Sequence, residues 1–152
     1  QAARAIDRQI IFLVGAALAL GTAMSATGAA AYLAHTIVAA LGDSGAAVTL
    51  SALFLLVAAF TNVLSNNATA VLFTPIALGA AAELGVDPRV FVYAVIFAAN
   101  CSFVTPMGYQ TNLLVMGPGH YRFSDFVRAG TPLVLVIWVT FSLFAPWYYG
   151  LW

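Results

Sequence analysis

Uncharged hydrogen-bonding residues gather in two short segments of the chain, each between apolar stretches. Residues 61–67 read Thr-Asn-Val-Leu-Ser-Asn-Asn, and residues 105–112 read Thr-Pro-Met-Gly-Tyr-Gln-Thr-Asn. Such residues compete for backbone hydrogen bonds and predict a break in a helix. Their side-chain oxygens, and the carbonyls that a break releases, suit a hard cation such as sodium. The candidate side-chain ligands are the hydroxyls of Thr61, Ser65 and Thr111 and the amides of Asn62, Asn66, Asn67, Gln110 and Asn112.

The charged residues stand only at the ends of the apolar stretches, where five arginines and five acids balance to a net charge of zero. A bound anion would therefore need neutralisation by a co-bound cation and by the positive end of the helix that starts near Asn66. Proton-driven carriers normally relay protons through an intramembrane carboxylate, which these stretches lack. Sodium coupling is the interpretation that the residues favour.

The composition excludes a soluble domain, because 63% of the 152 residues are hydrophobic, 7% are charged and the mean hydropathy is +1.00. Each of four uncharged stretches is long enough to cross about 30 Å of hydrocarbon. These stretches are residues 9–42, 44–82, 90–121 and 129–152. We expect an all-α membrane protein that does not bind nucleic acid. The single cysteine, Cys101, allows neither an internal disulfide nor a zinc or iron–sulfur site.

The first polar segment joins two apolar arms, residues 46–60 and 68–82, each about 22 Å long if helical and therefore short for a full span. This pattern predicts a re-entrant hairpin that enters and leaves the membrane on one face; two tilted spans are the alternative. Unpaired backbone in lipid costs several kcal/mol per group, so the break must be buried in protein or line a watery cavity. A transport site is the function that this location indicates.

The second polar segment follows the apolar arm 90–104 and predicts a discontinuous transmembrane helix. Two interrupted helices are typical of the binding site of a secondary transporter. A proline kink, with amides that link neighbouring helices, is the alternative.

The rest of the chain completes the expected organisation. We expect a first span and an interfacial helix at 1–45, the hairpin at 46–83, the broken helix at 88–117, a cytoplasmic connection at 118–130 and the last transmembrane helix at 131–152. With the start and the connection inside, four of the five arginines are cytoplasmic, as the positive-inside rule requires. The chain starts with glutamine and has no signal-peptide pattern, which suggests a fragment of a longer protein.

No catalytic constellation is visible in the sequence. His35 and His120 are far in sequence from the hydroxyl-rich segments, and every acid lies at a segment end, so no pair of base and nucleophile can be proposed. We therefore do not expect an enzyme.

Residues 61–67 and 108–112, followed by Gly-Pro-Gly at 117–119 and Tyr-Arg-Phe-Ser-Asp-Phe at 121–126, resemble the divalent anion/sodium symporters, which carry sulfate and dicarboxylates. The resemblance covers the whole chain and is strongest for the sulfate-type branch. It implies one inverted-repeat half, the C-terminal one, of an elevator-type secondary transporter. The expected partners are the missing N-terminal half, a small anion, membrane lipid and a second copy of the carrier, in the bacterial inner (plasma) membrane.

The resemblance also implies roles for individual residues. A co-transported sodium ion would bind the carbonyls of Thr61, Leu64 and Gly108 and the amide of Asn66. The anion would contact Ser65, Asn66, Asn67, Tyr109, Gln110 and Thr111. Tyr109 and Gln110 stand where dicarboxylate carriers of the family tend to have Thr-Pro, and Asn67 replaces a threonine. These departures favour sulfate over a dicarboxylate.

Two other interpretations stay open. A related permease for citrate, a dicarboxylate or arsenite would use the same interrupted helices. A membrane anchor or assembly subunit that does not transport would use its asparagines and glycines only to pack helices.

Overall fold

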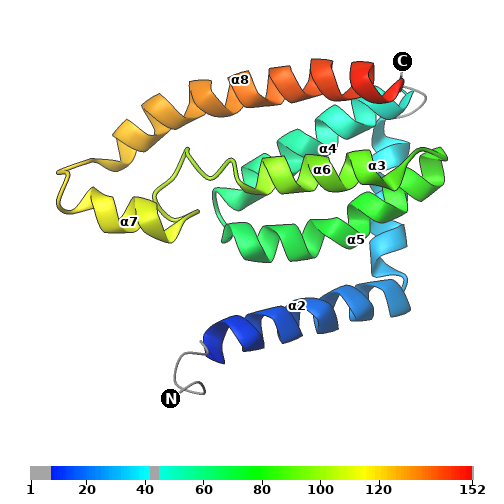
Figure 1. Ribbon diagram of the computed structural model, residues 1–152, viewed down its shortest axis with the longest axis horizontal. Coiled ribbons are helices and arrows are strands. Elements are labelled where there is room, and N and C mark those ends of the chain that lie inside the picture. Colours follow the sequence, from blue (N-terminus) through cyan, green and yellow to red (C-terminus); the bar gives the residue numbers. More distant parts are fainter. Residues whose placement is uncertain (1–7, 42–44, 152) are drawn as a thin grey trace.

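The computed structural model describes residues 8–41 and 45–151, and every regular element in these ranges is a helix. The helices are α2 (Arg8–Ala26), α3 (Ala29–Leu41), α4 (Gly45–Thr61), α5 (Asn66–Leu84), α6 (Pro88–Ala99), α7 (Gln110–Met116) and α8 (Phe123–Tyr149). Figure 1 shows α4, α5, α6 and α8 along the long axis of the molecule, with α3 crossing them near one end. The expected all-helical fold is confirmed.

Helices α4 and α5 form an antiparallel hairpin, and residues 62–65 between them are called the hairpin tip below. Ser65 ends the tip with extended backbone, and its Oγ accepts a hydrogen bond from the Ala68 N–H at 3.3 Å, which caps the start of α5. Gly85 closes the other end of α5 with a φ of 67°, a conformation that favours glycine. The helix break predicted over residues 61–67 is present, but it covers only residues 62–65, the hairpin tip.

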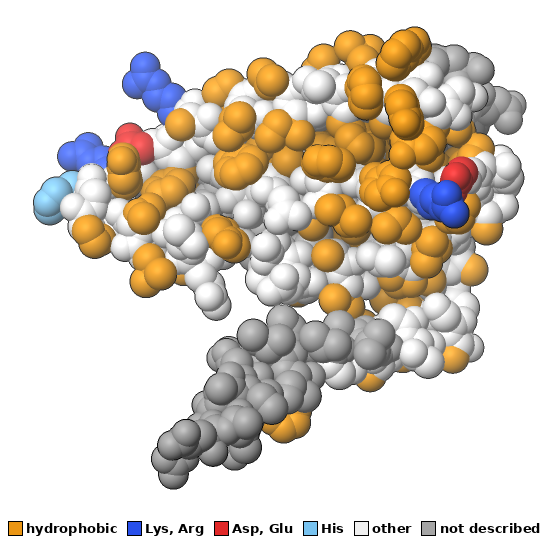
Figure 2. Space-filling model, viewed as in Figure 1, with side chains coloured by type: hydrophobic (Ala, Val, Ile, Leu, Met, Phe, Trp, Pro, Cys, Tyr) orange, Lys and Arg blue, Asp and Glu red, His pale blue; other side chains and the backbone are white. Residues whose placement is uncertain are grey.

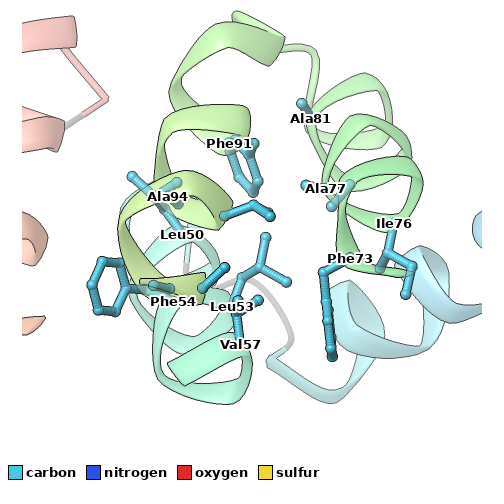
Figure 3. Packing of buried hydrophobic residues seen from close by; sticks show 14 of the residues in the cluster. Leu50, Leu53, Phe54, Val57, Phe73, Ile76, Ala77, Ala81, Phe91 and Ala94 are labelled. Atoms are coloured by element: carbon cyan, nitrogen blue, oxygen red, sulfur yellow. The ribbon is translucent and has the colours of Figure 1, made fainter. Parts of the chain in front are cut away.

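Apolar side chains of α4, α5 and α6 pack into one core (Figure 3). Each of the side chains that Figure 3 labels is at most 4% exposed. They are Leu50, Leu53, Phe54 and Val57 from α4, Phe73, Ile76, Ala77 and Ala81 from α5, and Phe91 and Ala94 from α6. The alanines let the helix backbones approach closely, which is how helices pack in the absence of a hydrophobic driving force within lipid. The hairpin and α6 therefore form one packed unit.

Helix α6 ends at Ala99, whereas the sequence predicts an apolar arm that continues to Val104. Residues 100–109, called the α6–α7 connection below, are not helical. Asn100 ends α6, and its side chain donates to the Ile96 carbonyl at 2.8 Å. Beyond it, the Cys101 carbonyl and the N–H groups of Val104 and Thr105 bond to the side chain of Asn62 in the hairpin tip. The interruption of the broken helix is therefore longer than predicted.

Helix α8 begins at Phe123, ahead of the start expected at residue 131. The Asp125 carboxylate accepts a hydrogen bond from the Arg122 N–H at 2.8 Å and caps the new first turn. The 27 residues of α8 make it about 40 Å long. At Gly130 it touches the α6–α7 connection, where an added Cβ would lie 2.2 Å from the Phe103 carbonyl oxygen. Only glycine permits this contact. Helix α8 therefore packs directly against the non-helical backbone of the α6–α7 connection.

Helices α2 and α3 meet at a sharp bend of 71°. Helix α3 packs across α5, where a Cβ on Gly79 would lie 3.1 Å from the Cβ of Ala34. His35 Nδ1 and Glu83 Oε1 are 2.6 Å apart and join α3 to the last turn of α5. The histidine that the sequence left without a role thus links α3 to the hairpin.

By length and composition, two of the described helices, α5 and α8, could cross a membrane, or three spans form if the bent pair α2 and α3 counts as one. Helices α4 and α6 are shorter. Figure 2 shows apolar side chains over the middle of one face and charged side chains toward its two ends. This distribution fits a membrane protein. Because α5 has 19 residues, its length is compatible both with one arm of a re-entrant hairpin and with a tilted span.

Candidate ion-binding site

The hairpin tip meets the α6–α7 connection, so the two polar segments singled out in the sequence lie together (Figure 1). The Thr61 hydroxyl donates to the Ala99 carbonyl at 2.6 Å, which joins the end of α4 to the end of α6. Gly108 lies against the same residue, because a Cβ added there would be 2.5 Å from the Thr61 carbonyl oxygen. Two interruptions about 40 residues apart in sequence therefore form one polar junction.

Asn62 holds this junction together and is 7% exposed. Its Nδ2 donates to the carbonyls of Ala58 at 2.7 Å and Cys101 at 3.1 Å. Its Oδ1 accepts from the N–H groups of Val104 at 2.9 Å and Thr105 at 3.2 Å. The Thr105 hydroxyl also donates to the Asn62 carbonyl. The amide has no capacity left for a cation, so the prediction that Asn62 is an ion ligand is wrong.

Asn112 makes a second tie within the α6–α7 connection. Its Nδ2 donates to the carbonyls of Ser102 at 2.8 Å and Thr105 at 3.3 Å. This amide nitrogen fixes non-helical backbone that would otherwise lack partners. Together, Asn62 and Asn112 replace the helix hydrogen bonds that the interruption removes.

The residues expected to bind sodium lie at the same junction. Thr61 ends α4, Leu64 lies in the tip, Asn66 begins α5, and Gly108 is buried against Thr61. In the described part of the chain, no hydrogen bond reaches the carbonyl oxygen of Thr61, Leu64 or Gly108. Free carbonyls on interrupted backbone are the groups from which proteins build sites for dehydrated alkali cations.

The residues expected to contact the anion fall into two groups. Ser65, Asn66 and Asn67 surround the N-terminus of α5, which carries partial positive charge. Ser65 Oγ accepts the Ala68 N–H, and Asn66 Oδ1 accepts the Asn67 N–H at 2.8 Å. An anion that took these two N–H groups would therefore displace the Ser65 and Asn66 side chains.

The second group, Tyr109, Gln110 and Thr111, is exposed where α7 begins. Within the ranges that the structure describes, no hydrogen bond joins this group to the residues around the start of α5. The sequence places both groups next to the junction, but the structure does not bring them into contact.

Comparison with known proteins gives the family. The family model described as "Citrate transporter" (CitMHS) matches residues 1–151. The chain belongs to the citrate transporter family. Its relatives include the uncharacterized transporter sll0640 of Synechocystis sp., 43% identical over 96% of this chain and 24% of that protein.

Two further relatives have names that state a substrate. Sodium/sulfate cotransporter 1 of Chlamydomonas reinhardtii is 32% identical over 87% of this chain and 15% of its own length. The sodium-dependent dicarboxylate transporter SdcS of Staphylococcus saprophyticus is 27% identical over 90% of this chain and 27% of its own length. The resemblance to sodium-dependent sulfate and dicarboxylate carriers is confirmed. The chain spans about a quarter or less of the length of sll0640 and of sodium/sulfate cotransporter 1.

One polar group in α5, the hydroxyl of Thr69, was not predicted to take part in a site. Thr69 is fully buried, and its Oγ1 has no hydrogen-bond partner in the described chain. It lies in the arm 68–82, where a threonine normally bonds to its own helix and attracts no notice. Counting residues from the start of α5 at Asn66 would have placed Thr69 one turn from the hairpin tip. Only the structure shows that its hydroxyl has no hydrogen-bond partner among the described residues.

Proposed function

We propose that this chain is the C-terminal repeat of a sodium-coupled symporter for a small divalent anion, with sulfate as the preferred substrate. The observation that carries the proposal is the polar junction, where the Thr61 carbonyl lies against Gly108 beside the N-terminus of α5. The family match and the relatives named as sodium/sulfate and dicarboxylate transporters support anion transport.

Sodium would bind the carbonyls of Thr61, Leu64 and Gly108 together with the Asn66 amide oxygen. The anion would bind next to it, at the N-terminus of α5, with Ser65, Asn66 and Asn67. A helix end supplies only about half of an elementary charge, so it cannot neutralise a divalent anion in the membrane interior. The co-bound cation supplies the missing charge, and this electrostatic dependence couples the two ions.

The second group of expected anion contacts, Tyr109, Gln110 and Thr111, would approach from the start of α7. Their exposure leaves their side chains free to close over an anion. Because Tyr109 and Gln110 differ from the Thr-Pro pair of dicarboxylate carriers, we assign them to substrate selectivity.

The hairpin would enter and leave the membrane on one face, while α6 and α7 form one broken span and α8 forms the last span. The shared core of α4, α5 and α6 supports their movement as one body, as elevator transport requires. Helix α3 would lie at the interface and join this body to α2. The N-terminal half of the carrier, and a second copy in a homodimer, would complete the integral membrane assembly.

A carrier of citrate or another carboxylate is the second candidate, because the matching family is described as citrate transporters and one relative is named for dicarboxylates. It would use the same sodium site with a larger anion. The carrier would then take up labelled citrate or succinate in a sodium gradient, whereas the sulfate proposal predicts uptake of labelled sulfate that excess citrate or succinate does not suppress.

Asn66→Ala in the full-length carrier tests the proposed site. Asn66 would contact both ions, so its loss removes two interactions with charged groups, each worth about 1.5 kcal/mol, and lowers sodium-dependent sulfate uptake about a hundredfold. Uptake into proteoliposomes is measured over a range of sodium concentrations.

The control for Asn66 is Asn100→Ala, since Asn100 is also exposed near the junction, but its side chain bonds, among the described residues, only to the Ile96 carbonyl of its own helix. Asn100→Ala should keep most of the uptake. Normal uptake by Asn66→Ala, with unchanged sodium dependence, would remove Asn66 from the site.

A further inference from the structure

Thr69 departs from the pattern of the other buried and half-buried threonines of the described helices. In Thr49 and Thr74 the hydroxyl donates to the carbonyl four residues earlier, at 3.2 and 2.6 Å, and in Thr61 it donates to the Ala99 carbonyl at 2.6 Å. The Thr69 N–H bonds to the Ser65 carbonyl at 3.0 Å, but the Thr69 hydroxyl, with 0% exposure, bonds to nothing in the described chain. A buried hydroxyl without a partner is unfavourable, so native proteins rarely keep one unless something else binds it.

The register of α5 places this hydroxyl next to the polar junction. Thr69 and Phe73 are four residues apart and share one face of the helix. The Phe73 ring packs against Phe60, with ring centroids 5.3 Å apart, so this face of α5 looks toward the last turn of α4. Thr69 lies one turn nearer to the tip than Phe73. It therefore faces the end of α4, where the Thr61 carbonyl is free.

We infer that Thr69 Oγ1 is a further ligand of the sodium ion, an inference that rests on the proposed function. Its hydroxyl has two lone pairs and is fully desolvated, which suits a hard cation stripped of water. The carbonyls of Thr61 and Gly108 would bind the ion from the junction, and Thr69 would bind it from inside the hairpin. The ion would give the Thr69 hydroxyl the partner that it lacks, and the hydroxyl would complete the coordination of the ion on the side of the packed core.

The test compares Thr69→Val, Thr69→Ala and Thr69→Ser in the purified full-length carrier. Two quantities are measured: the half-saturating sodium concentration for sulfate uptake, and the rise in thermal midpoint on addition of sodium. We expect Thr69→Val and Thr69→Ala to raise the half-saturating concentration about tenfold, the loss of one hydrogen-bond-like contact to an ion. Thr69→Ser keeps the hydroxyl and should stay within about twofold of the unmodified carrier.

Thr49→Val is the matched control, because Thr49 is 1% exposed but its hydroxyl already bonds to the Gly45 carbonyl. It should leave the sodium response unchanged. In sodium-free buffer, Thr69→Val should raise the thermal midpoint, since it removes an unpartnered hydroxyl while keeping the shape of the side chain. A higher thermal midpoint without sodium, together with a weaker response to sodium, is a combination that a packing role for Thr69 would not produce.

The outcomes separate this inference from the proposed function. No sodium response in the unmodified carrier would overturn both. A normal response in the unmodified carrier and an unchanged one in Thr69→Val would overturn only the role of Thr69. If Thr69→Val does not fold, the half-saturating sodium concentration of Thr69→Ala decides in the same way.

Discussion

Gly108→Ala should raise the half-saturating sodium concentration for sulfate uptake by the full-length carrier about a hundredfold. The added Cβ would lie 2.5 Å from the Thr61 carbonyl oxygen and 3.0 Å from the Ser102 Cβ. The first of these contacts is with backbone, so it cannot be relieved by a rotamer change, and the end of α4 must move away from the α6–α7 connection. Two proposed sodium ligands are then displaced together. A shift of about 1 Å in a preorganised site can lower its activity about a hundredfold. We expect a loss of that size in the apparent affinity for sodium.

Gly117→Ala is the control for Gly108, because a Cβ added at Gly117 meets nothing within 4 Å and its φ is −67°. Both variants are measured for sulfate uptake as a function of sodium concentration. If Gly108→Ala kept the half-saturating sodium concentration of the unmodified carrier, the close approach of Thr61 and Gly108 would have no part in sodium binding.

Asn62→Ala should destabilise the carrier more than the other substitutions considered. It would leave two N–H groups, of Val104 and Thr105, and two carbonyls, of Ala58 and Cys101, without the partner that they have now. An unsatisfied buried group costs about 1–3 kcal/mol, and with partial relaxation we expect a total of about 3–6 kcal/mol. The thermal midpoint of the purified carrier should fall by many degrees, and uptake should be lost with it.

Asn100→Ala again provides the comparison for Asn62, since it removes one exposed amide that bonds within its own helix. Its thermal midpoint should stay close to that of the unmodified carrier. A normal midpoint for Asn62→Ala would contradict the role of Asn62 as the link between the hairpin tip and the α6–α7 connection.

The sequence was sufficient to predict both interruptions, because amides, glycine and proline disfavour helix within the segment itself. It was not sufficient to predict that α6 ends at Ala99. Residues 101–104 are mostly apolar, and their non-helical backbone is stabilised by Asn62, about 40 residues earlier. Such a long-range hydrogen bond leaves no local pattern. The early start of α8 did have a local signal, the acid at Asp125 in its first turn.

The candidate site was predictable to a similar degree. By residue type alone, Asn62 and Asn66 are equivalent candidates for an oxygen ligand. In the structure the Asn62 amide bonds only to backbone groups of the described chain, whereas Asn66 lies at the start of a helix. The difference depends on which carbonyls and N–H groups lie within reach. Thr69 gave no signal, because the same residue type in the same helix, Thr74, bonds to its own backbone.

The most direct test of the central claim is the uptake of radiolabelled sulfate by the full-length carrier in proteoliposomes. An inward sodium gradient is compared with an equal potassium gradient and with a proton gradient. We predict that sulfate accumulates only when sodium is present outside in excess. Accumulation driven equally well by potassium or by protons, or no sulfate accumulation under a sodium gradient, would contradict the proposal that the polar junction is a sodium-coupled sulfate site.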